Sequence, residues 1–184
     1  MNTAPWNVSL PTTLDVGGEE KPIRTDYRVA LDIFLALTDP ELDDYNRAME
    51  TLDMLYINEI QPQDWQEALD QAMWYLRGGE DERNQKSPQL VSWTQDFQYI
   101  ASPVSKVIGQ DVRGMESLHW WSFLSAYMAI GDCLFAQIVA IRDKKARGKK
   151  LDKADREFYR RNRDLIDIKK PVTDAEAAIL KEWM

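Results

Sequence analysis

The residue types best suited to chemistry in this chain are one histidine and one cysteine. His119 lies in the stretch LHWWSF, residues 118–123, beside Trp120 and Trp121, and Cys133 follows it at a distance of 14 positions. The two side chains could form part of a metal site, or a nucleophile with its general base. Zinc requires three or four convergent ligands, which one histidine and one cysteine do not supply. We therefore expect no metal, no cofactor and no catalytic residue, and a hydrogen-bonded structural role for His119.

Other chemical motifs are missing as well. The sequence contains no phosphate-binding loop, dinucleotide fingerprint, zinc-protease motif or serine-hydrolase elbow. The acidic run from Asp39 to Asp44 lacks the glycine and the distal glutamate of a calcium loop. It suits a helix N-terminus instead, where carboxylates meet the positive end of the helix dipole. We expect a protein that is not an enzyme.

Hydrophobic spacing predicts a mainly α-helical fold that follows a short N-terminal β-hairpin. The hairpin is expected within residues 10–25, with its turn at Gly17 and Gly18. Apolar periodicity, proline starts and glycine stops then predict seven or eight helices. The expected helical ranges are 26–37, 40–56, 62–76, 88–100, 115–130, 134–145, 151–168 and 174–183. The charged, glycine-marked residues 78–89 are expected to form a loop, and 104–108 a shorter piece between Pro103 and Gly109.

The length of 184 residues fits one domain of ordinary size, because domains run to about 100 to 200 residues. Hydrophobic residues make up 44% of the chain and charged residues 29%, which allows a core to form. We expect an N-terminal extension at 1–13, one compact helical domain at 14–170 that includes the hairpin, and a short C-terminal helix or tail at 171–184.

The helix expected at 115–130 is apolar on most of its circumference, with a narrow polar stripe at His119, Ser122 and Ser125. A helix of this kind is buried in a core or an interface. Trp120 and Trp121 point about 100° apart, so they enter different pockets. We interpret both tryptophans as packing residues, and Cys133 as a small buried hydrophobe.

Charge is divided unevenly along the chain. The net charge is −8, which disfavours nonspecific binding to nucleic acid or to an anionic membrane. Residues 142–170, however, contain 13 basic and 6 acidic side chains, so this segment carries +7 and the remainder −15. Arg156, Arg160 and Arg163 form a candidate interaction surface within it. This surface could bind an acidic partner or nucleic acid, it could be a solvated face, or it could help subunits attract one another.

The sequence has no apolar run of the roughly 18 residues that a membrane span needs, and no basic start followed by an apolar leader. A lone cysteine allows no intrachain disulfide, which fits a reducing compartment. We expect a cytoplasmic protein without a membrane partner.

Three stretches of the sequence carry a resemblance to a known family. Residues 14–37 include Thr-Asp-Tyr-Arg at 25–28, the TDYR stretch, and residues 98–130 include Leu118, His119, Trp120 and Trp121, the LHWW stretch. Residues 138–165 hold Ile141 and Arg142 before the basic helix. In these stretches the chain resembles the bacteriophage gene-product-fifteen family, small proteins encoded in the tail region of long-tailed phages and prophages.

The resemblance implies a role in tail assembly within the host bacterial cytoplasm. Family members are similar in gene position to tail assembly chaperones, which keep the helical tape measure protein soluble until tail tube subunits polymerise around it. The expected partners are therefore the tape measure protein, the tail tube protein as a further candidate, and other copies of the chain. Two alternatives stay open: a minor structural component of the virion tail, and a nucleic-acid-binding factor that uses residues 142–163.

Overall fold

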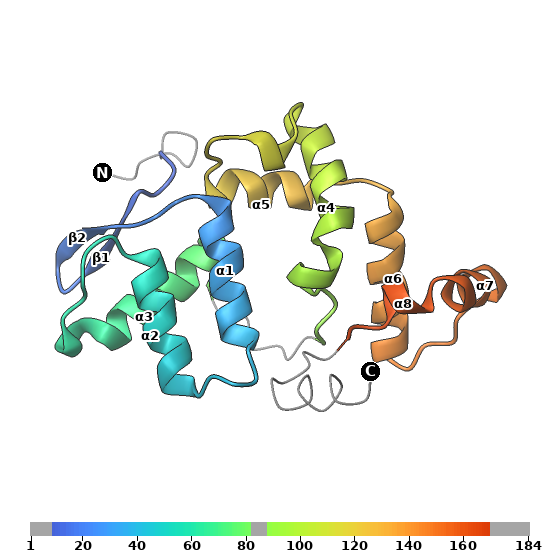
Figure 1. The fold of residues 1–184 in the computed structure, drawn as a ribbon, viewed down its shortest axis with the longest axis horizontal. Helices are drawn as coiled ribbons and strands as arrows, with labels where there is room; N and C mark the ends of the chain where they lie inside the picture. Colours follow the sequence, from blue (N-terminus) through green and yellow to red (C-terminus); the bar gives the residue numbers. More distant parts are fainter. Residues whose placement is uncertain (1–8, 82–87, 170–184) are drawn as a thin grey trace, which may run out of the picture. The chain divides into compact units, whose positions relative to one another are not determined.

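The computed structural model describes residues 9–81 and 88–169 (Figure 1). Within these residues, a two-stranded antiparallel hairpin precedes eight α-helices, so the predicted fold class is confirmed. The elements are β1 (Thr13–Val16), β2 (Glu19–Pro22), α1 (Tyr27–Thr38), α2 (Asp44–Leu55), α3 (Trp65–Leu76), α4 (Trp93–Ile108), α5 (Trp120–Met128), α6 (Leu134–Ala146), α7 (Lys153–Arg161) and α8 (Arg163–Ile166). Short 3₁₀ turns occupy Pro62–Asp64 and Val112–Gly114. Every helix of the described ranges is too short or too polar to span a lipid bilayer.

The hairpin forms where glycine permits a tight turn. Gly17 and Gly18 have φ angles of +64° and +75°, which a two-residue hairpin turn of this kind requires. The strands pair in the register that sets Val16 opposite Glu19, and Leu14 and Val16 are buried on one face of β1. The predicted hairpin and the position of its turn are confirmed.

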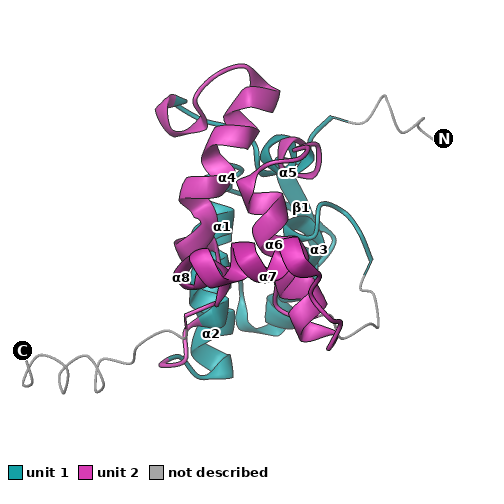
Figure 2. Cartoon of the chain, turned by 90° about the vertical axis from the view of Figure 1, so that its right-hand side faces the viewer, with its two compact units in different colours: residues 1–38, 42–83, 115–125 teal, residues 39–41, 84–114, 126–184 magenta. Residues whose placement is uncertain are grey.

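The chain divides into two compact units, coloured separately in Figure 2. Unit 1 comprises residues 1–38, 42–83 and 115–125, and unit 2 comprises residues 39–41, 84–114 and 126–184. In unit 1, α1 packs on α2, α2 on α3, and α3 on β1. In unit 2, α6 packs on α4 and α8 around Ile138, Ile141 and Ile166. The expected extension at 1–13 and tail at 171–184 lie largely or wholly outside the described residues, so the predicted domain boundaries stay a prediction.

Helix α2 begins later than its proline suggests. Pro40 was expected near the first position, but the helix starts at Asp44, and the Asp43 carboxylate accepts the Asn46 N–H at 2.8 Å as its N-cap. Upstream, Asp39 accepts the Glu41 N–H at 2.8 Å, which holds Pro40 in a turn. The acidic run does supply a helix N-terminus, as predicted, through its third carboxylate.

Helix α4 also differs from its prediction. It was expected to start at residue 88 and to end before Pro103, whereas it starts at Trp93 and runs through the proline to Ile108. The Ser92 hydroxyl accepts the Gln95 N–H and caps the start. Ile100 and Val104 are buried on either side of Pro103, and this packing outweighs the backbone hydrogen bond that proline removes.

The basic helix expected at 151–168 is two helices, α7 and α8, which meet at Asn162. The side-chain amide of Asn162 donates to the Phe158 carbonyl at 2.9 Å, in competition with a continuing helix. The carbonyls of Leu165 and Ile166 both accept hydrogen bonds from Arg142, which favours the end of α8 at Ile166. The helix predicted at 174–183 and residues 82–87 of the predicted loop at 78–89 lie outside the described residues.

Candidate functional site

The TDYR stretch and the LHWW stretch, which are far apart in the sequence, meet in unit 1. The Tyr27 N–H donates to the Leu118 carbonyl at 2.8 Å. A second backbone hydrogen bond, from Trp120 to Thr25, has a length of 2.7 Å, and the two bonds form an isolated antiparallel bridge. The TDYR and LHWW stretches therefore form one junction, in which the N-terminus of α1 pairs with the N-terminus of α5.

The Asp26 carboxylate serves both sides of this junction. One oxygen accepts the Arg28 N–H at 2.9 Å and so caps α1. The other accepts the Leu118 N–H at 3.1 Å, across 92 positions of sequence. The Arg28 guanidinium donates to the carbonyls of Met115 and Glu116, which fixes the chain leading into the LHWW stretch.

The two adjacent tryptophans close the C-terminal end of α3. The indole N–H of Trp120 donates to the Leu76 carbonyl at 3.0 Å, and that of Trp121 donates to the Tyr75 carbonyl at 2.9 Å. The last carbonyls of a helix have no partner within the helix. The Trp120 indole satisfies the Leu76 carbonyl, whereas the Tyr75 carbonyl accepts the Gly78 N–H at 3.0 Å as well as the Trp121 indole. Trp120 is 1% exposed and Trp121 is half-buried, and their rings occupy different pockets, as expected.

A glycine pair makes room for this contact. Gly78 and Gly79 have φ angles of +74° and +84°. A Cβ atom would lie 2.8 Å from the Leu124 side chain at Gly78, and 2.9 Å from the Trp121 ring at Gly79. Both the backbone conformation and the space therefore require glycine.

His119 precedes helix α5 rather than lying within it, and both of its ring nitrogens form hydrogen bonds. Its Nδ1 accepts the Trp121 N–H at 3.0 Å, and its Nε2 then donates to the Pro11 carbonyl at 2.9 Å. Helix α5 was expected to start at residue 115, but it starts at Trp120, because the backbone groups of Leu118 are paired with the TDYR stretch. In residues 9–81 and 88–169, no three His, Cys, Asp or Glu side chains are grouped as metal ligands would be.

Cys133 is not the buried hydrophobe that its neighbours suggest. It is half-buried and forms the N-cap of α6, where its Sγ accepts the Ala136 N–H at 3.5 Å. His119 and Cys133 thus each cap a separate helix.

Tyr75 lies in the packed interior of the junction. Its ring stacks on Trp121 and meets the edge of His119. The hydroxyl is buried and has no hydrogen-bond partner among the described residues. Burial raises the pKa of the Tyr75 hydroxyl, and the Asp26 carboxylate raises it further, so this group stays protonated at neutral pH.

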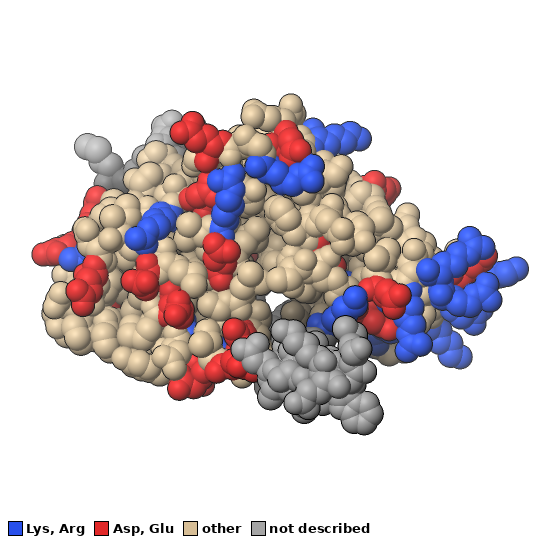
Figure 3. Space-filling model, viewed as in Figure 1, with Lys and Arg blue, Asp and Glu red and all other residues tan. Residues whose placement is uncertain are grey.

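In unit 2, basic side chains gather over α7 and the turn before it (Figure 3). We call the α7 surface the exposed cations of residues 149–160 that form no ion pair within the described residues, namely Lys149, Lys150, Lys153, Arg156 and Arg160. Of the predicted trio, Arg156 and Arg160 lie one turn apart on α7. Arg163 lies on α8, and its guanidinium contacts the Asp167 carboxylate at 3.2 Å. The structure thus places Arg156 and Arg160 on one surface, whereas Arg163 forms an ion pair with Asp167 of the same chain.

Arg142 organises the interior of unit 2. It forms two hydrogen bonds with the buried Asp96 carboxylate, and it also donates to the carbonyls of Leu90, Leu165 and Ile166. Both charged side chains are almost fully buried. This arginine therefore joins α6 to α4 and α8.

Unit 1 has an open groove of about 390 Å³ beside the C-terminal end of α2. Its apolar walls are Met49, Leu52, Tyr56, Ile57, Ile60 and Trp65. Two carboxylates, Asp53 and Glu59, also line it. Arg24 contributes a cation, but its Nη1 is directed at three carbonyls at the end of α2, including that of Asp53 at 2.8 Å. The groove combines apolar surface with acidic groups, which suits a segment that carries both apolar and basic side chains.

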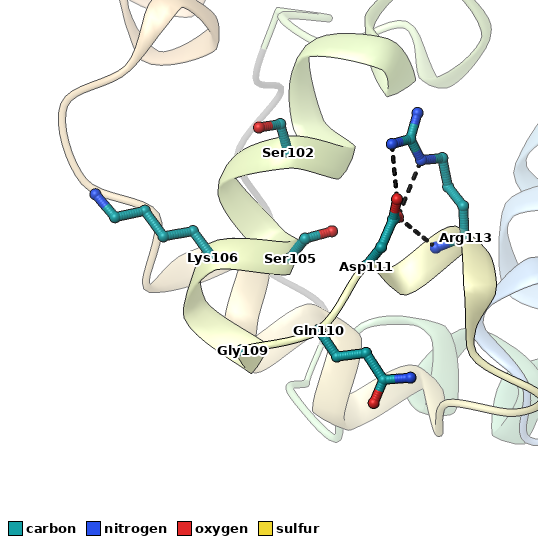
Figure 4. Close-up of a pocket in the computed structure, with 7 residues that line it drawn as sticks. All are labelled: Ser102, Ser105, Lys106, Gly109, Gln110, Asp111 and Arg113. Carbon is teal, nitrogen blue, oxygen red and sulfur yellow. Dashed lines mark hydrogen bonds and ion pairs between the residues drawn. The ribbon is translucent and has the colours of Figure 1, made fainter.

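A second hollow, at the C-terminal end of α4, has polar groups that satisfy one another (Figure 4). Asp111 and Arg113 form paired hydrogen bonds, and these hold the pKa of Asp111 below its usual value. The Ser105 hydroxyl donates to the Ala101 carbonyl and accepts the Val112 N–H. Lys106 points away from the Asp111 carboxylate, so the charged groups do not converge on a ligand.

Sequence reasoning missed the residues that build these contacts. Asp96 gave no signal of its own, because its partner Arg142 is distant in sequence. Gly79 was predicted as part of a helix stop, but its close approach to the Trp121 ring was not. Arg142 did give a signal: it follows the apolar run IVAI, so its side chain leaves a buried face of the helix and needs a buried partner.

Comparison with known proteins identifies the chain at the level of a family. The family model described as Bacteriophage Gp15 protein matches residues 7–168, which includes the TDYR stretch, the LHWW stretch and Arg142. No curated protein and no solved structure gives a significant match. Because the match covers most of the 184 residues, this chain belongs to the Bacteriophage Gp15 protein family.

Proposed function

We propose that this protein is a noncatalytic chaperone of phage tail assembly, which binds the tape measure protein in the host cytoplasm. The observation that carries the proposal is the open groove of unit 1, on a member of a phage family. Ile57 in its wall is 54% exposed. Tyr45 is 59% exposed and meets the Trp65 ring edge-on at 6.3 Å. Exposed apolar side chains around a groove favour the binding of one face of an amphipathic helix.

Co-expression with the tape measure protein of the same phage tests the proposal. We expect the two proteins to co-purify, and the tape measure protein to be more soluble than when it is expressed alone. Met49→Glu and Ile57→Glu should abolish both effects, because a charge in the groove would be buried by the partner. Val107→Glu is the control, since Val107 is an exposed apolar residue of α4 in unit 2. The proposal fails if the wild-type protein neither binds the tape measure protein nor keeps it soluble.

Purified virions separate a chaperone from a minor structural component of the tail. A chaperone leaves before the particle is complete, so mass spectrometry of virions should find this chain absent or strongly depleted relative to the tail tube protein. Constant stoichiometric presence would favour the structural role instead. The co-purification assay with the tail tube protein tests the further candidate partner.

A further inference from the structure

We infer that the protein self-associates head to tail, with the α7 surface of one copy docked on the acidic groove in unit 1 of a second copy. This inference concerns contacts between copies of the protein, so its test needs no tape measure protein, although both proposals use the groove of unit 1. It names a donor surface and an acceptor surface, each within one unit.

The donor surface consists of cations that the chain itself leaves available. Other basic side chains nearby are engaged: Lys144 pairs with Asp155, and Arg161 pairs with Glu157. The members of the α7 surface form no such pair within the described ranges. Arg156 and Arg160 are presented on a helix, because Phe158 between them packs inward on the cluster of Ile138, Ile141 and Ile166.

The acceptor surface consists of carboxylates that are likewise exposed and form no ion pair within the described residues. Within the part of the chain that the structure describes, Glu50, Asp53 and Glu59 are exposed and form no ion pair. Asp53 and Glu59 line the groove, where Trp65 and Tyr56 also form part of the wall. An arginine side chain fits this chemistry: its stem packs on apolar surface, its guanidinium bonds carboxylates, and its planar face stacks on aromatic rings.

The charge of each unit supports a second copy as the partner. The described residues of unit 1 carry 16 acidic and 5 basic side chains, and those of unit 2 carry 11 acidic and 14 basic. The two units thus have opposite net charge, of −11 and +3. Because the contact joins different surfaces, it is heterologous and builds a ring or an open filament.

Nucleic acid fits the α7 surface less well. Acidic side chains stand among the cations, namely Asp152, Asp155 and Glu157. The aromatic residues of α7, Phe158 and Tyr159, pack inward instead of presenting their rings to bases. An acidic protein surface can place its charges between these groups, whereas a continuous phosphate backbone would meet repulsion.

The experiment uses the full chain and a reciprocal exchange of charge. One variant is Arg156→Glu with Arg160→Glu, and the other is Asp53→Arg with Glu59→Arg. Light scattering and sedimentation are measured over a range of protein concentrations, at salt from 0.05 to about 0.5 M, which shortens the screening length severalfold. We expect wild-type oligomers that dissociate as salt rises. Each variant alone should associate roughly tenfold or more weakly, and an equimolar mixture should restore association.

The controls make each outcome decisive. Lys106→Glu with Lys169→Glu changes net charge equally, outside the α7 surface, and should leave association intact. Circular dichroism verifies that each variant folds, and Arg156→Ala with Arg160→Ala replaces the reversal if it does not. A wild-type protein that stays monomeric at every salt level overturns the inference. So does a mixture that fails to associate, and so does a monomer that binds duplex DNA with strong salt dependence.

Discussion

Arg142 and Asp96 lie 46 positions apart and form a two-point ion pair in the interior of unit 2, with N–O distances of 2.5 and 3.0 Å. The remaining guanidinium N–H groups reach backbone carbonyls, and the Asp96 carboxylate also accepts the Ser92 N–H at 2.9 Å. When a buried ion pair makes all of its hydrogen bonds, the stability of the protein falls strongly if either partner is removed.

We expect Asp96→Leu or Arg142→Met to destabilise the protein by about 3 to 5 kcal/mol, because each leaves the other side chain as an uncompensated buried charge. Joint replacement by Asp96→Leu and Arg142→Met should cost less than the sum of the two single changes. Urea unfolding of the four proteins measures this coupling. Additive losses would show that the two side chains act independently.

The tryptophan pair gives a second prediction. Trp120→Ala should cost about 3 to 5 kcal/mol, and Trp121→Ala less, since its ring is only half-buried. Trp120→Phe removes the indole N–H from the Leu76 carbonyl, which should cost about 1 to 3 kcal/mol if that carbonyl becomes buried without a partner. Trp121→Phe should cost less, because the Tyr75 carbonyl keeps the Gly78 N–H. Trp74→Phe is the control, because the Trp74 ring contacts Trp121 but caps no carbonyl of α3. Thermal unfolding compares the variants, and equal losses for Trp74→Phe and Trp120→Phe would contradict the capping role.

The glycine pair can be tested against a third glycine. Gly79→Ala combines an unfavourable φ angle with a contact of 2.9 Å to the Trp121 ring. Gly109→Ala has the same φ of +84° but open space around the new methyl group. We expect Gly109→Ala to lose about 1 to 2 kcal/mol from backbone strain alone, and Gly79→Ala to lose more. A smaller loss at Gly79, measured by urea unfolding, would mean that the ring moves away freely.

His119 should behave as a helix cap. His119→Ala removes the acceptor of the Trp121 N–H and the donor to Pro11, for which we expect a loss of about 0.5 to 2 kcal/mol. His119→Asn offers a capping oxygen at the same position, so it should lose less. Zinc analysis of the purified wild-type protein accompanies the unfolding measurement. Stoichiometric zinc that is lost in either variant would refute the structural role.

Asp167 gives a pH dependence. Partial burial acts to raise its pKa, but hydrogen bonds from Lys145, Tyr159 and Arg163 hold the pKa below its usual value. A depressed folded-state pKa stabilises the protein above the unfolded value of about 3.9, and this contribution is lost as the pH falls further. Asp167→Asn should therefore be less stable than wild type at pH 6, with the gap closing toward pH 3. Asp164→Asn, which removes the same charge from an exposed carboxylate of α8, is the control, and urea midpoints compare the two variants.

Local signals predicted the first half of the fold well. Gly17 and Gly18 set the hairpin turn, Pro62 opened the approach to α3, and Gly78 ended that region, because turn chemistry and apolar spacing act over a few residues. The error at the start of α5 arose because distant groups take over backbone hydrogen bonds. Residues 115–119 are not helical because the TDYR stretch pairs with them, and that pairing leaves no trace in local periodicity.

In the candidate sites too, features set by local spacing could be predicted, whereas features set by tertiary packing could not. Arg156 and Arg160 could be placed on one helix from their spacing alone, whereas the engagement of Arg163 depends on the break at Asn162. The groove of unit 1 was not predicted, because Met49 and Trp65 belong to different helices and only tertiary packing brings them to one wall.

The junction also has a consequence for synthesis of the chain. Unit 1 needs residues 115–125, and Tyr27 stacks on Phe123 at 4.5 Å between ring centres. A ribosome releases residues 9–81 long before it releases the LHWW stretch, so the nascent α1 and α3 wait with an apolar face uncovered and two helix-end carbonyls without their indole partners. The first unit to emerge is thus completed only after residues 84–114 of the second have been made.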